Sequence, residues 1–216
     1  MTELVTADLH IGHKRLAVGM RGFSSAEEMD DILVRNWNES VKEDDVVYVL
    51  GDLTMRKFGH EQVLKQLNGS KVFVRGNHDK HLSDEKLLKY FRKVDTQDSL
   101  KIGTDRGVRH IRMYHYPCYT WNGSFHGSWL LCGHTHGMLR ESLPTVWTAG
   151  LILDVGMDVW GMRPVPMDEI IRVMFWKEDK IAKYGGTQFG DYKRIGWPSG
   201  PLEEARAWSS GDRVLE

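Results

Sequence analysis

The chain has 216 residues, a length that favours one main domain with a buried core. Its 29 Lys and Arg residues are balanced by 30 Asp and Glu residues, so no overall basic field attracts nucleic acid, and no extended nucleic-acid groove is expected. No apolar run approaches the roughly 20 residues of a membrane span, and the acidic N-terminal segment is unlike a signal peptide. We therefore expect a cytoplasmic protein without a membrane partner, in which Cys118 and Cys132 are free thiols.

The first predicted strand is short and leads into polar residues. Leu4 and Val5 run directly towards Asp8 and His10, so the strand delivers these side chains at its C-terminal end. A Ser-x-x-Glu capping spacing follows, with apolar residues at helical intervals, and together they predict an amphipathic helix over residues 26–40.

Two further strands are predicted to end in the same way. The continuous apolar run Val46–Leu50 is typical of a strand buried on both faces, and Asp52 follows it closely. A short helix around residues 63–67 and an Asn-Gly turn then lead to a strand over 71–75, which opens onto Asn77. Polar side chains are therefore expected at successive strand ends.

The order of the remaining elements completes the predicted architecture. They are a helix near 87–91, a hairpin over 99–114 that ends at His115, a strand over 129–132 before His134 and His136, a strand over 151–155 and a helix near 168–176. This order predicts an α/β sandwich of two packed sheets with flanking helices. We expect one domain over residues 1–183 and a C-terminal extension over 184–216, whose Trp197 and Trp208 favour docking on the domain.

Side chains that suit metal ions gather at the predicted strand ends. They are two carboxylates, one amide and five imidazoles: Asp8, Asp52, Asn77, His10, His78, His115, His134 and His136. Mixed oxygen and nitrogen ligands without thiolates suit Mn, Fe, Zn or Ni. The set is too large for one ion, so it predicts two divalent ions about 3.5–4 Å apart, with Asp52 as the bridging carboxylate.

Each motif has a plainer interpretation when it is taken alone. Asp52 could end an ordinary strand, and residues 76–79 could form a turn whose Asn and Asp bond their own backbone. His134 and His136 could belong to a polar strand edge, because alternate residues of an extended segment point the same way. Their occurrence together at successive strand ends favours metal binding.

The whole motif series resembles that of the calcineurin-like metallophosphoesterases over residues 4–160. The matching motifs are Asp8-Leu9-His10, Gly51-Asp52, Gly76-Asn77-His78-Asp79, His115 and Gly133-His134-Thr135-His136. The segments Asp8–His13, Phe23–Asn38, His115–Pro117 and Gly156–Trp160 are similar to the small single-domain branch of that superfamily in bacteria and their phages. For a phage protein, the expected location is the host cytoplasm. The resemblance implies a four-layer α/β/β/α sandwich of two mixed sheets.

The resemblance also implies a role for each matching residue. The first ion would be held by Asp8, His10 and His136, the second by Asn77, His115 and His134, and Asp52 would be shared. It further implies that His78 faces the substrate as a general acid or cationic donor, that Asp79 orients His78, and that Arg75 grips phosphate oxygens. His13 is expected behind a ligand or beside the substrate, whereas the remaining histidines are expected at the surface: His60, His81, His110 and His126.

These features predict a phosphoesterase in which two divalent ions, with Mn preferred, activate a hydroxide for in-line attack on phosphorus. The leading interpretation is a phosphodiesterase for small nucleotide-like esters such as 2′,3′-cyclic nucleotides. A phosphomonoesterase or protein phosphatase with the same metals is the alternative enzyme. A noncatalytic scaffold, like the retromer subunit that shares the fold, would be expected to have lost ligands, and here every motif position is filled. The sequence makes no prediction of the oligomeric state.

Overall fold

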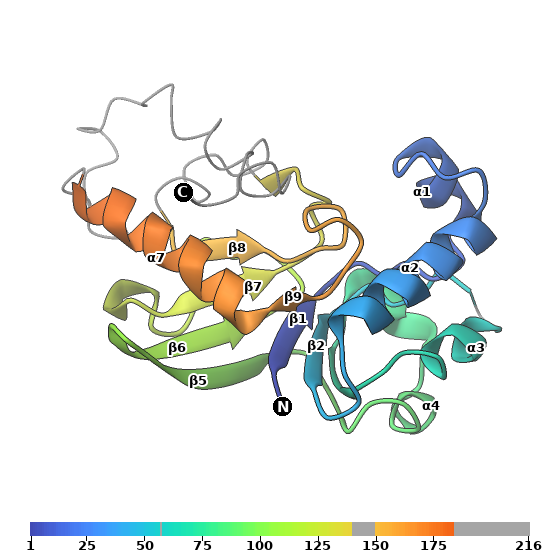
Figure 1. Ribbon diagram of the computed structural model, residues 1–216, viewed down its shortest axis with the longest axis horizontal. Coiled ribbons are helices and arrows are strands. Elements are labelled where there is room, and N and C mark those ends of the chain that lie inside the picture. Colours follow the sequence, from blue (N-terminus) through green and yellow to red (C-terminus); the bar gives the residue numbers. More distant parts are fainter. Residues whose placement is uncertain (57, 140–149, 184–216) are drawn as a thin grey trace.

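The computed structural model describes residues 1–56, 58–139 and 150–183 of the chain (Figure 1). Its first elements are β1 (Glu3–Thr6), α1 (Lys14–Gly19), α2 (Ala26–Ser40), β2 (Val46–Leu50), α3 (His60–Leu64), β3 (Ser70–Val74), the 3₁₀ helix η1 (Asn77–His81), α4 (Asp84–Leu87) and β4 (Lys93–Asp95). They are followed by β5 (Asp98–Thr104), β6 (Gly107–Met113), the 3₁₀ helix η2 (Ser124–His126), β7 (Trp129–Cys132), β8 (Ile152–Asp154), β9 (Val165–Pro166) and α7 (Met167–Lys183).

The strands form two mixed sheets, as the sequence predicts. The five-stranded sheet has the order β4-β3-β2-β1-β9, in which β1 to β4 run parallel and β9 is antiparallel to β1. The four-stranded sheet has the order β5-β6-β7-β8, in which β5 and β6 form the predicted hairpin and β6, β7 and β8 run parallel. The carboxyl ends of the parallel strands therefore meet along shared edges, where polar side chains can converge.

Alternating residues of the five-stranded sheet belong to two different cores. In β2, Tyr48 and Leu50 pack with residues of β6, β7, β8 and α7, whereas Val47 and Val49 pack with α2 and α3. Every residue of β2 is buried, which is the reason its sequence is apolar without alternation. This central strand fixes the position of the turn that contains Asp52.

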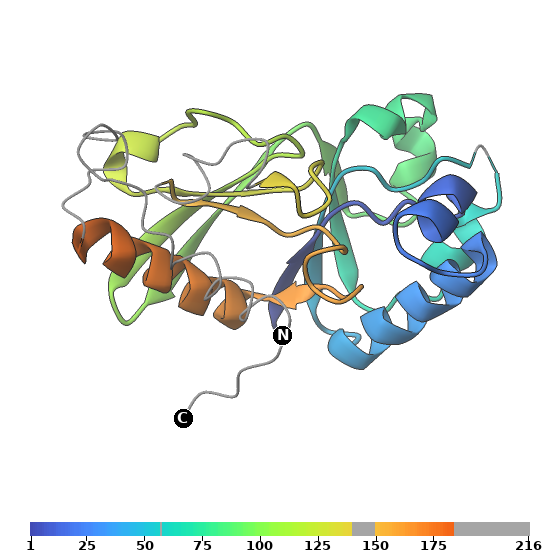
Figure 2. The same ribbon diagram turned by 90° about the horizontal axis from the view of Figure 1, so that it is seen from above.

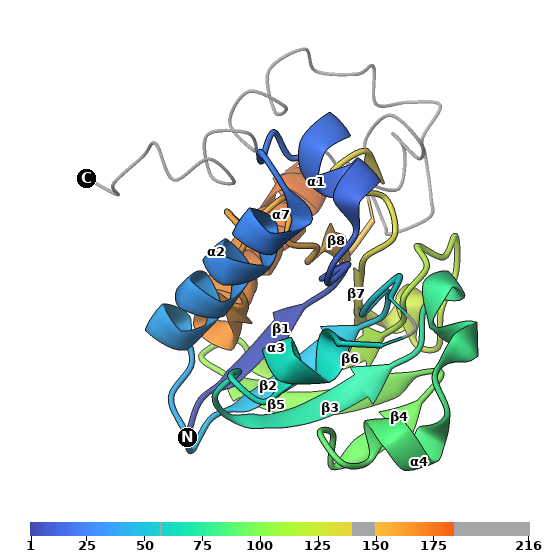
Figure 3. The same ribbon diagram turned by 90° about the vertical axis from the view of Figure 1, so that its right-hand side faces the viewer.

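Helices flank both sheets. Helices α1 to α4 lie at the end of the molecule built by β1 to β4, and α7 lies along the half built by β5 to β8 (Figures 1 and 2). Figure 3 views the molecule from the end that α1 to α4 occupy, with α3 in front of β2. The rings of Phe175 in α7 and Trp129 in β7 form a T-shaped pair with their centroids 5.7 Å apart, which anchors α7 to the second sheet.

The long helix α2 shows how the sequence specifies a boundary. Its N-cap is Ser25, whose hydroxyl accepts the N–H of Glu28 at 3.1 Å, as expected. The Glu28 carboxylate accepts instead from Ser24, so only half of the predicted capping box forms. Trp37 is fully buried, and its indole N–H donates to the carbonyl of Asn68, which ties α2 to the turn before β3.

Some predicted elements differ in the structure. Helix α4 ends at Leu87, earlier than predicted, and the chain then turns so that Phe91 still enters the core.

Cys118 and Cys132 are free, as predicted. The predicted C-terminal extension over 184–216 lies outside the described residues. Within the described part of the chain, no helix has both the length and the apolar character that a bilayer crossing requires.

Candidate metal centre

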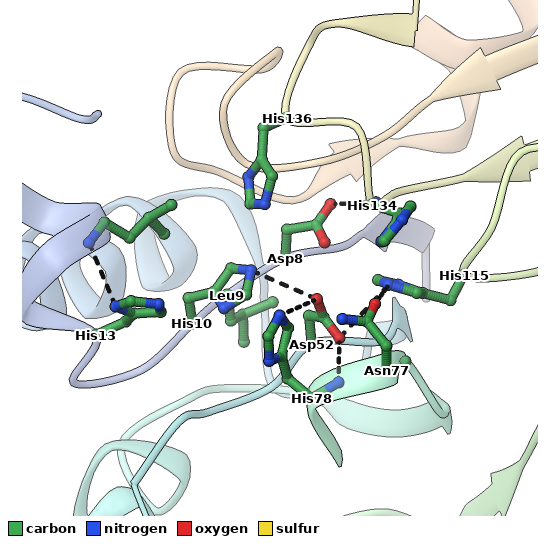
Figure 4. A network of polar contacts seen from close by, with 12 residues as sticks. Asp8, Leu9, His10, His13, Asp52, Asn77, His78, His115, His134 and His136 are labelled. Carbon is green, nitrogen blue, oxygen red and sulfur yellow. Dashed lines mark hydrogen bonds and ion pairs between the residues drawn. The ribbon is translucent and has the colours of Figure 1, made fainter. Parts of the chain in front are cut away.

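The predicted metal ligands all follow the ends of strands. β1 ends shortly before Asp8 and His10, β2 before Asp52, β3 before Asn77, β6 before His115, and β7 before His134 and His136. Strands from both sheets contribute, so the candidate centre lies where the two sheets meet. Figure 4 shows these side chains directed towards one another around Asp52.

The backbone at the centre adopts an unusual conformation. Among the described residues, six other than glycine have a positive φ angle, and five of them are predicted ligands: Asp8 (58°), His10 (50°), Asp52 (52°), His134 (73°) and His136 (49°). A left-handed conformation costs a non-glycine residue on the order of 1–3 kcal/mol, and such residues cluster at functional sites. The distribution of this strain therefore marks the strand ends as a site under functional constraint.

Asp52 occupies the middle of the cluster. Its Oδ2 lies 3.6 Å from Nε2 of His10, and its Oδ1 lies 3.4 Å from Nε2 of His115. The backbone N–H of His78 also donates to Oδ1 at 3.0 Å, which holds the carboxylate in place (Figure 4). The two oxygens thus face imidazoles from two different motifs, as a bridging carboxylate requires.

The candidate ligands divide into two groups. One group is Asp8, His10 and His136, and the other is Asp52, His115 and His134; within each group, one donor atom per residue lies within 4.8 Å of the others. Oδ1 of Asn77 is 2.9 Å from Nε2 of His115, which places this amide in the second group. The structure brings together the same two sets that the family resemblance implies.

Buried polar atoms in the group of Asp8, His10 and His136 fit a cation. Oδ1 of Asp8 and both ring nitrogens of His10 are buried, and they have no hydrogen-bond partner among the described residues. A buried polar atom without a partner costs about 1–3 kcal/mol, so three of them in one place need a compensating ligand. Carboxylate and imidazole donors suit divalent transition metals, and a cation would satisfy Oδ1 of Asp8 and one ring nitrogen of His10.

Burial is the main cause of the pKa shifts of the candidate ligands. Burial raises the pKa of Asp8 well above its ordinary value, and the nearby carboxylate of Asp154 adds to the effect. Burial also lowers the pKa of His10 to about 2, with a further contribution from His136. The pKa of His134 is lowered by burial and by the neighbouring His115. The fold therefore favours the neutral imidazoles of His10 and His134, the form that binds metal.

Of the three residues predicted to be catalytic, His78 and Asp79 belong to η1, and Arg75 lies between β3 and η1. The His78 ring is 39% exposed, and its Nε2 lies 3.8 Å from Oδ2 of Asp52. The carboxylate of Asp79, the predicted orienter of this ring, accepts N–H groups from the backbone of the neighbouring strand ends. The Arg75 guanidinium forms an ion pair with Asp84 and donates to the carbonyl of Asp79 at 3.1 Å.

The other histidines are placed as predicted, with one exception. His13 is half-buried, and its ring forms a T-shaped pair with the His10 ring, the two centroids 5.5 Å apart, next to the candidate centre. The prediction of a surface position is confirmed for His81, His110 and His126. It is wrong for His60, which is 3% exposed because α3 begins at this residue with the ring turned inwards.

Three residues that the motifs do not identify support the centre: Arg21, Asp154 and Asp158. The Asp158 carboxylate contacts His136 and is paired with Arg21, and Asp154 accepts from the Thr135 hydroxyl at 2.6 Å. Burial alone would raise the pKa of Asp158, but hydrogen bonds from His136 and Arg21 outweigh it and lower that pKa below its ordinary value. The segment Gly156–Trp160 carries a family resemblance, which was the only signal for Asp158.

The comparisons with known proteins agree with this geometry. The family model of the calcineurin-like phosphoesterases matches residues 1–138. An uncharacterized protein of Methanocaldococcus jannaschii is 30% identical over 172 residues, which cover 78% of this chain and 88% of that protein. The gene 66 protein of Mycobacterium phage L5 is 30% identical over 190 residues, which cover 76% of this chain and 90% of that protein.

A solved structure shares the fold. The protein of unknown function from Aquifex aeolicus superposes with a TM-score of 0.59 at 20% sequence identity, over 80% of this chain and 98% of that one. The family match spans every strand of the five-stranded sheet except β9, and it includes all seven predicted ligands. The chain therefore belongs to the calcineurin-like phosphoesterase family of metal-dependent phosphoric ester hydrolases.

Proposed function

We propose that this protein is a dinuclear phosphodiesterase that acts on small nucleotide-like esters such as 2′,3′-cyclic nucleotides, with Mn as the preferred metal. The position of Asp52 carries the proposal, because its two oxygens lie 3.6 Å and 3.4 Å from imidazoles of the two ligand groups. A carboxylate so placed can serve two ions at once. A cytoplasmic location is part of the proposal, since the unpaired Cys118 and Cys132 suit a reducing compartment.

Seven residues would hold the two ions. They are Asp8, His10 and His136 on one side, Asn77, His115 and His134 on the other, and Asp52 between them. When bound, a pair of divalent ions supplies Lewis-acid chemistry, which acidifies water and offsets the negative charge of a phosphoryl group. The protein contributes a set of donors of which Asp8, His10, Asp52 and His115 are buried, and five of the seven stand on backbone with a positive φ angle.

His78 is the proposed acid. Its backbone N–H is held by Asp52, so the residue is fixed next to the bridging carboxylate while its ring remains partly exposed. From this position Nε2 can donate a proton to the ester oxygen that leaves. In the structure, Arg75 stabilises η1 through its contacts with Asp84 and with the carbonyl of Asp79. It can bind a phosphate oxygen only after it releases Asp84.

The surroundings of the centre support a nucleotide-like ester. The ring of Tyr116 lies 4.9 Å from the rings of both His115 and His134, and the residue is 43% exposed. An aromatic ring at the edge of a phosphoesterase centre can stack on a nucleobase, which contributes about 1–3 kcal/mol per base. The balanced charge of the chain offers no long basic surface for a polymer.

A hydrolysis panel tests the substrate class. Mn-reconstituted protein should hydrolyse bis-p-nitrophenyl phosphate and cyclic nucleotides with a higher kcat/KM than p-nitrophenyl phosphate, a monoester. Asp52→Asn, purified in parallel, controls for contaminating phosphatases and should be inactive. A higher kcat/KM for the monoester would instead favour a phosphomonoesterase, and inactivity of the metal-loaded protein towards every ester would favour a noncatalytic scaffold.

A further inference from the structure

A buried ion pair lies behind one of the two ligand groups. Nδ1 of His136 is 2.8 Å from Oδ2 of Asp158, and Nε and Nη2 of Arg21 each donate to a different oxygen of the same carboxylate at 2.8 Å. The side chains of Arg21 and Asp158 are only 3% and 11% exposed. Because Asp158 takes up Nδ1, the His136 ring presents Nε2 as its ligand atom.

The same arginine holds the first ligand motif. Nη2 of Arg21 donates to the carbonyl of Asp8 at 2.6 Å, and Nη1 donates to the carbonyl of Leu9 at 3.2 Å. These bonds fix the segment in which Asp8 and His10 both have a positive φ angle. One guanidinium therefore connects the backbone of two ligands with the side chain that orients the third, His136.

The other ligand group has weaker support. Nδ1 of His115 is 2.8 Å from the carbonyl oxygen of Leu50, a neutral acceptor. The His134 side chain is exposed, and within the described ranges its ring has aromatic neighbours but no hydrogen bond. An orienting carboxylate raises the basicity of a metal-bound histidine more than a neutral carbonyl does, and it restricts the ring more than solvent does.

The charges of the ligands also favour metal binding by the group of Asp8, His10 and His136. The group of Asp8, His10 and His136 has a carboxylate of its own in addition to the shared Asp52, whereas the other group adds only the neutral amide of Asn77. Two carboxylates attract a divalent cation more strongly than one, and burial reduces the screening of that attraction.

We propose that the site formed by Asp8, His10 and His136 is the tighter of the two metal sites, and that Arg21 and Asp158 are the positioning pair that makes it so. The ions would then load in order, and the site of Asn77, His115 and His134 would exchange its ion more readily. This inference rests on the proposed dinuclear centre and deepens it.

Metal binding to the full-length protein provides the first test. Mn-loaded protein is dialysed against buffers of graded free Mn²⁺, and bound Mn is counted by elemental analysis. Two ions should be lost in two steps whose midpoints differ at least about tenfold. Two indistinguishable steps would overturn the inference but leave the dinuclear centre intact, whereas at most one bound ion would refute both.

A matched pair of variants assigns the steps to sites. His136→Ala should remove the tight step and His134→Ala the weak one, since the two residues belong to the same loop but to different ligand groups. Loss of the tight step in His134→Ala, with retention in His136→Ala, would reverse the assignment and overturn the inference.

The ion pair itself is tested by removing both charges together. Arg21→Met combined with Asp158→Leu avoids an unpaired buried charge, and it should weaken the tight step by about 10–100-fold while the weak step moves less. The control is Arg106→Met with Asp179→Leu, an exposed Arg–Asp pair between the β5–β6 hairpin and α7. If the tight step has the same midpoint in the double variant as in the control, the proposed role of Arg21 and Asp158 is overturned. If the double variant does not fold, the wild-type titration and the two histidine variants decide the order of loading.

Discussion

Oδ2 of Asp79 accepts the backbone N–H of Asp52 at 2.9 Å, although the two residues are 27 positions apart in the sequence. The same carboxylate accepts the N–H of Leu53 at 2.9 Å through Oδ1 and that of Gly76 at 2.6 Å through Oδ2. Asp79 is fully buried. It therefore joins the turn after β2 to the turn after β3, and it positions the bridging Asp52 through the backbone.

Removing this carboxylate should destabilise the protein. Asp79→Ala would leave three backbone N–H groups without their acceptor, each at a cost of about 1–3 kcal/mol. We expect the free energy of unfolding, measured by urea denaturation, to fall by at least about 3 kcal/mol. Asp84→Ala removes a carboxylate that is 68% exposed, so it should change stability by less than about 1 kcal/mol. Equal losses in the two variants would show that the backbone bonds of Asp79 are not what stabilises the turns.

A glycine next to the bridging carboxylate gives a steric prediction. A Cβ atom at Gly76 would lie 2.3 Å from Oδ1 of Asp52, whereas a Cβ at Gly103 in β5 would have no neighbour within 4 Å. Neither position has a positive φ angle, so the two Ala variants differ mainly in crowding. Gly76→Ala should lower the bound Mn per chain under conditions that saturate the wild type, and Gly103→Ala should not. Full Mn occupancy in Gly76→Ala would show that Asp52 can move without loss of a ligand.

The sequence predicts the strands and the ligand groups well because both are local features. Val46–Leu50 is apolar at every position since both of its faces are buried, and the polar residue that matters follows directly after it. Parallel pairing brings the ends of β1, β2 and β3 together in one sheet, and the packing of the second sheet against it adds the ends of β6 and β7. Asp52 and His115 are 63 residues apart, yet each can be assigned to its strand end from its own motif.

The supporting contacts are harder to predict because they depend on tertiary structure. Arg21 and Asp158 are 137 residues apart, and Arg21 lies in a loop without a motif. Asp79 binds backbone amides, and because nearly every residue type has one, the sequence does not reveal which residues Asp79 contacts. The burial of His60 follows from the inward turn at the start of α3, which the sequence does not signal.

A buried lysine outside the centre predicts a pH dependence of stability. Lys177 in α7 is 3% exposed and donates to the carbonyl of Ile152 at 2.6 Å, and burial lowers its pKa from 10.5 to about 7. Between pH 7 and 10.5 the unfolded chain binds a proton at this lysine that the folded chain does not bind. Its contribution therefore makes stability rise with pH, by up to about 1.4 kcal/mol per pH unit.

Lys177→Met should remove this slope. The variant should gain most over the wild type near pH 7, and the gain should shrink as the pH approaches 10, measured as the difference between their free energies of unfolding. Lys93→Met replaces a lysine that is 46% exposed, and its stability profile should run parallel to that of the wild type. A parallel profile for Lys177→Met as well would mean that Lys177 remains protonated in the folded protein.

The proposed acid should be separable from the metal ligand beside it. Asn77 belongs to a ligand group, whereas the His78 ring is 39% exposed and is placed next to Asp52 without completing either group. His78→Ala should keep the wild-type Mn content and lower kcat by roughly 10²–10⁴. Asn77→Ala should lower the Mn affinity instead. Loss of an ion from His78→Ala would make this histidine a ligand.

The size of the loss at His78 should also depend on the leaving group. A p-nitrophenolate leaves without much protonation, whereas a ribose oxygen needs a proton as its bond to phosphorus breaks. If Nε2 of His78 supplies that proton, His78→Ala should reduce kcat/KM for a cyclic nucleotide by more than it reduces kcat/KM for bis-p-nitrophenyl phosphate. For each ester, the measurement is the ratio of kcat/KM in His78→Ala to that in the wild type. Because both ratios come from the same preparations, differences in metal content cancel. Equal ratios would instead assign His78 to stabilising the phosphoryl charge, a role that both esters require to the same extent.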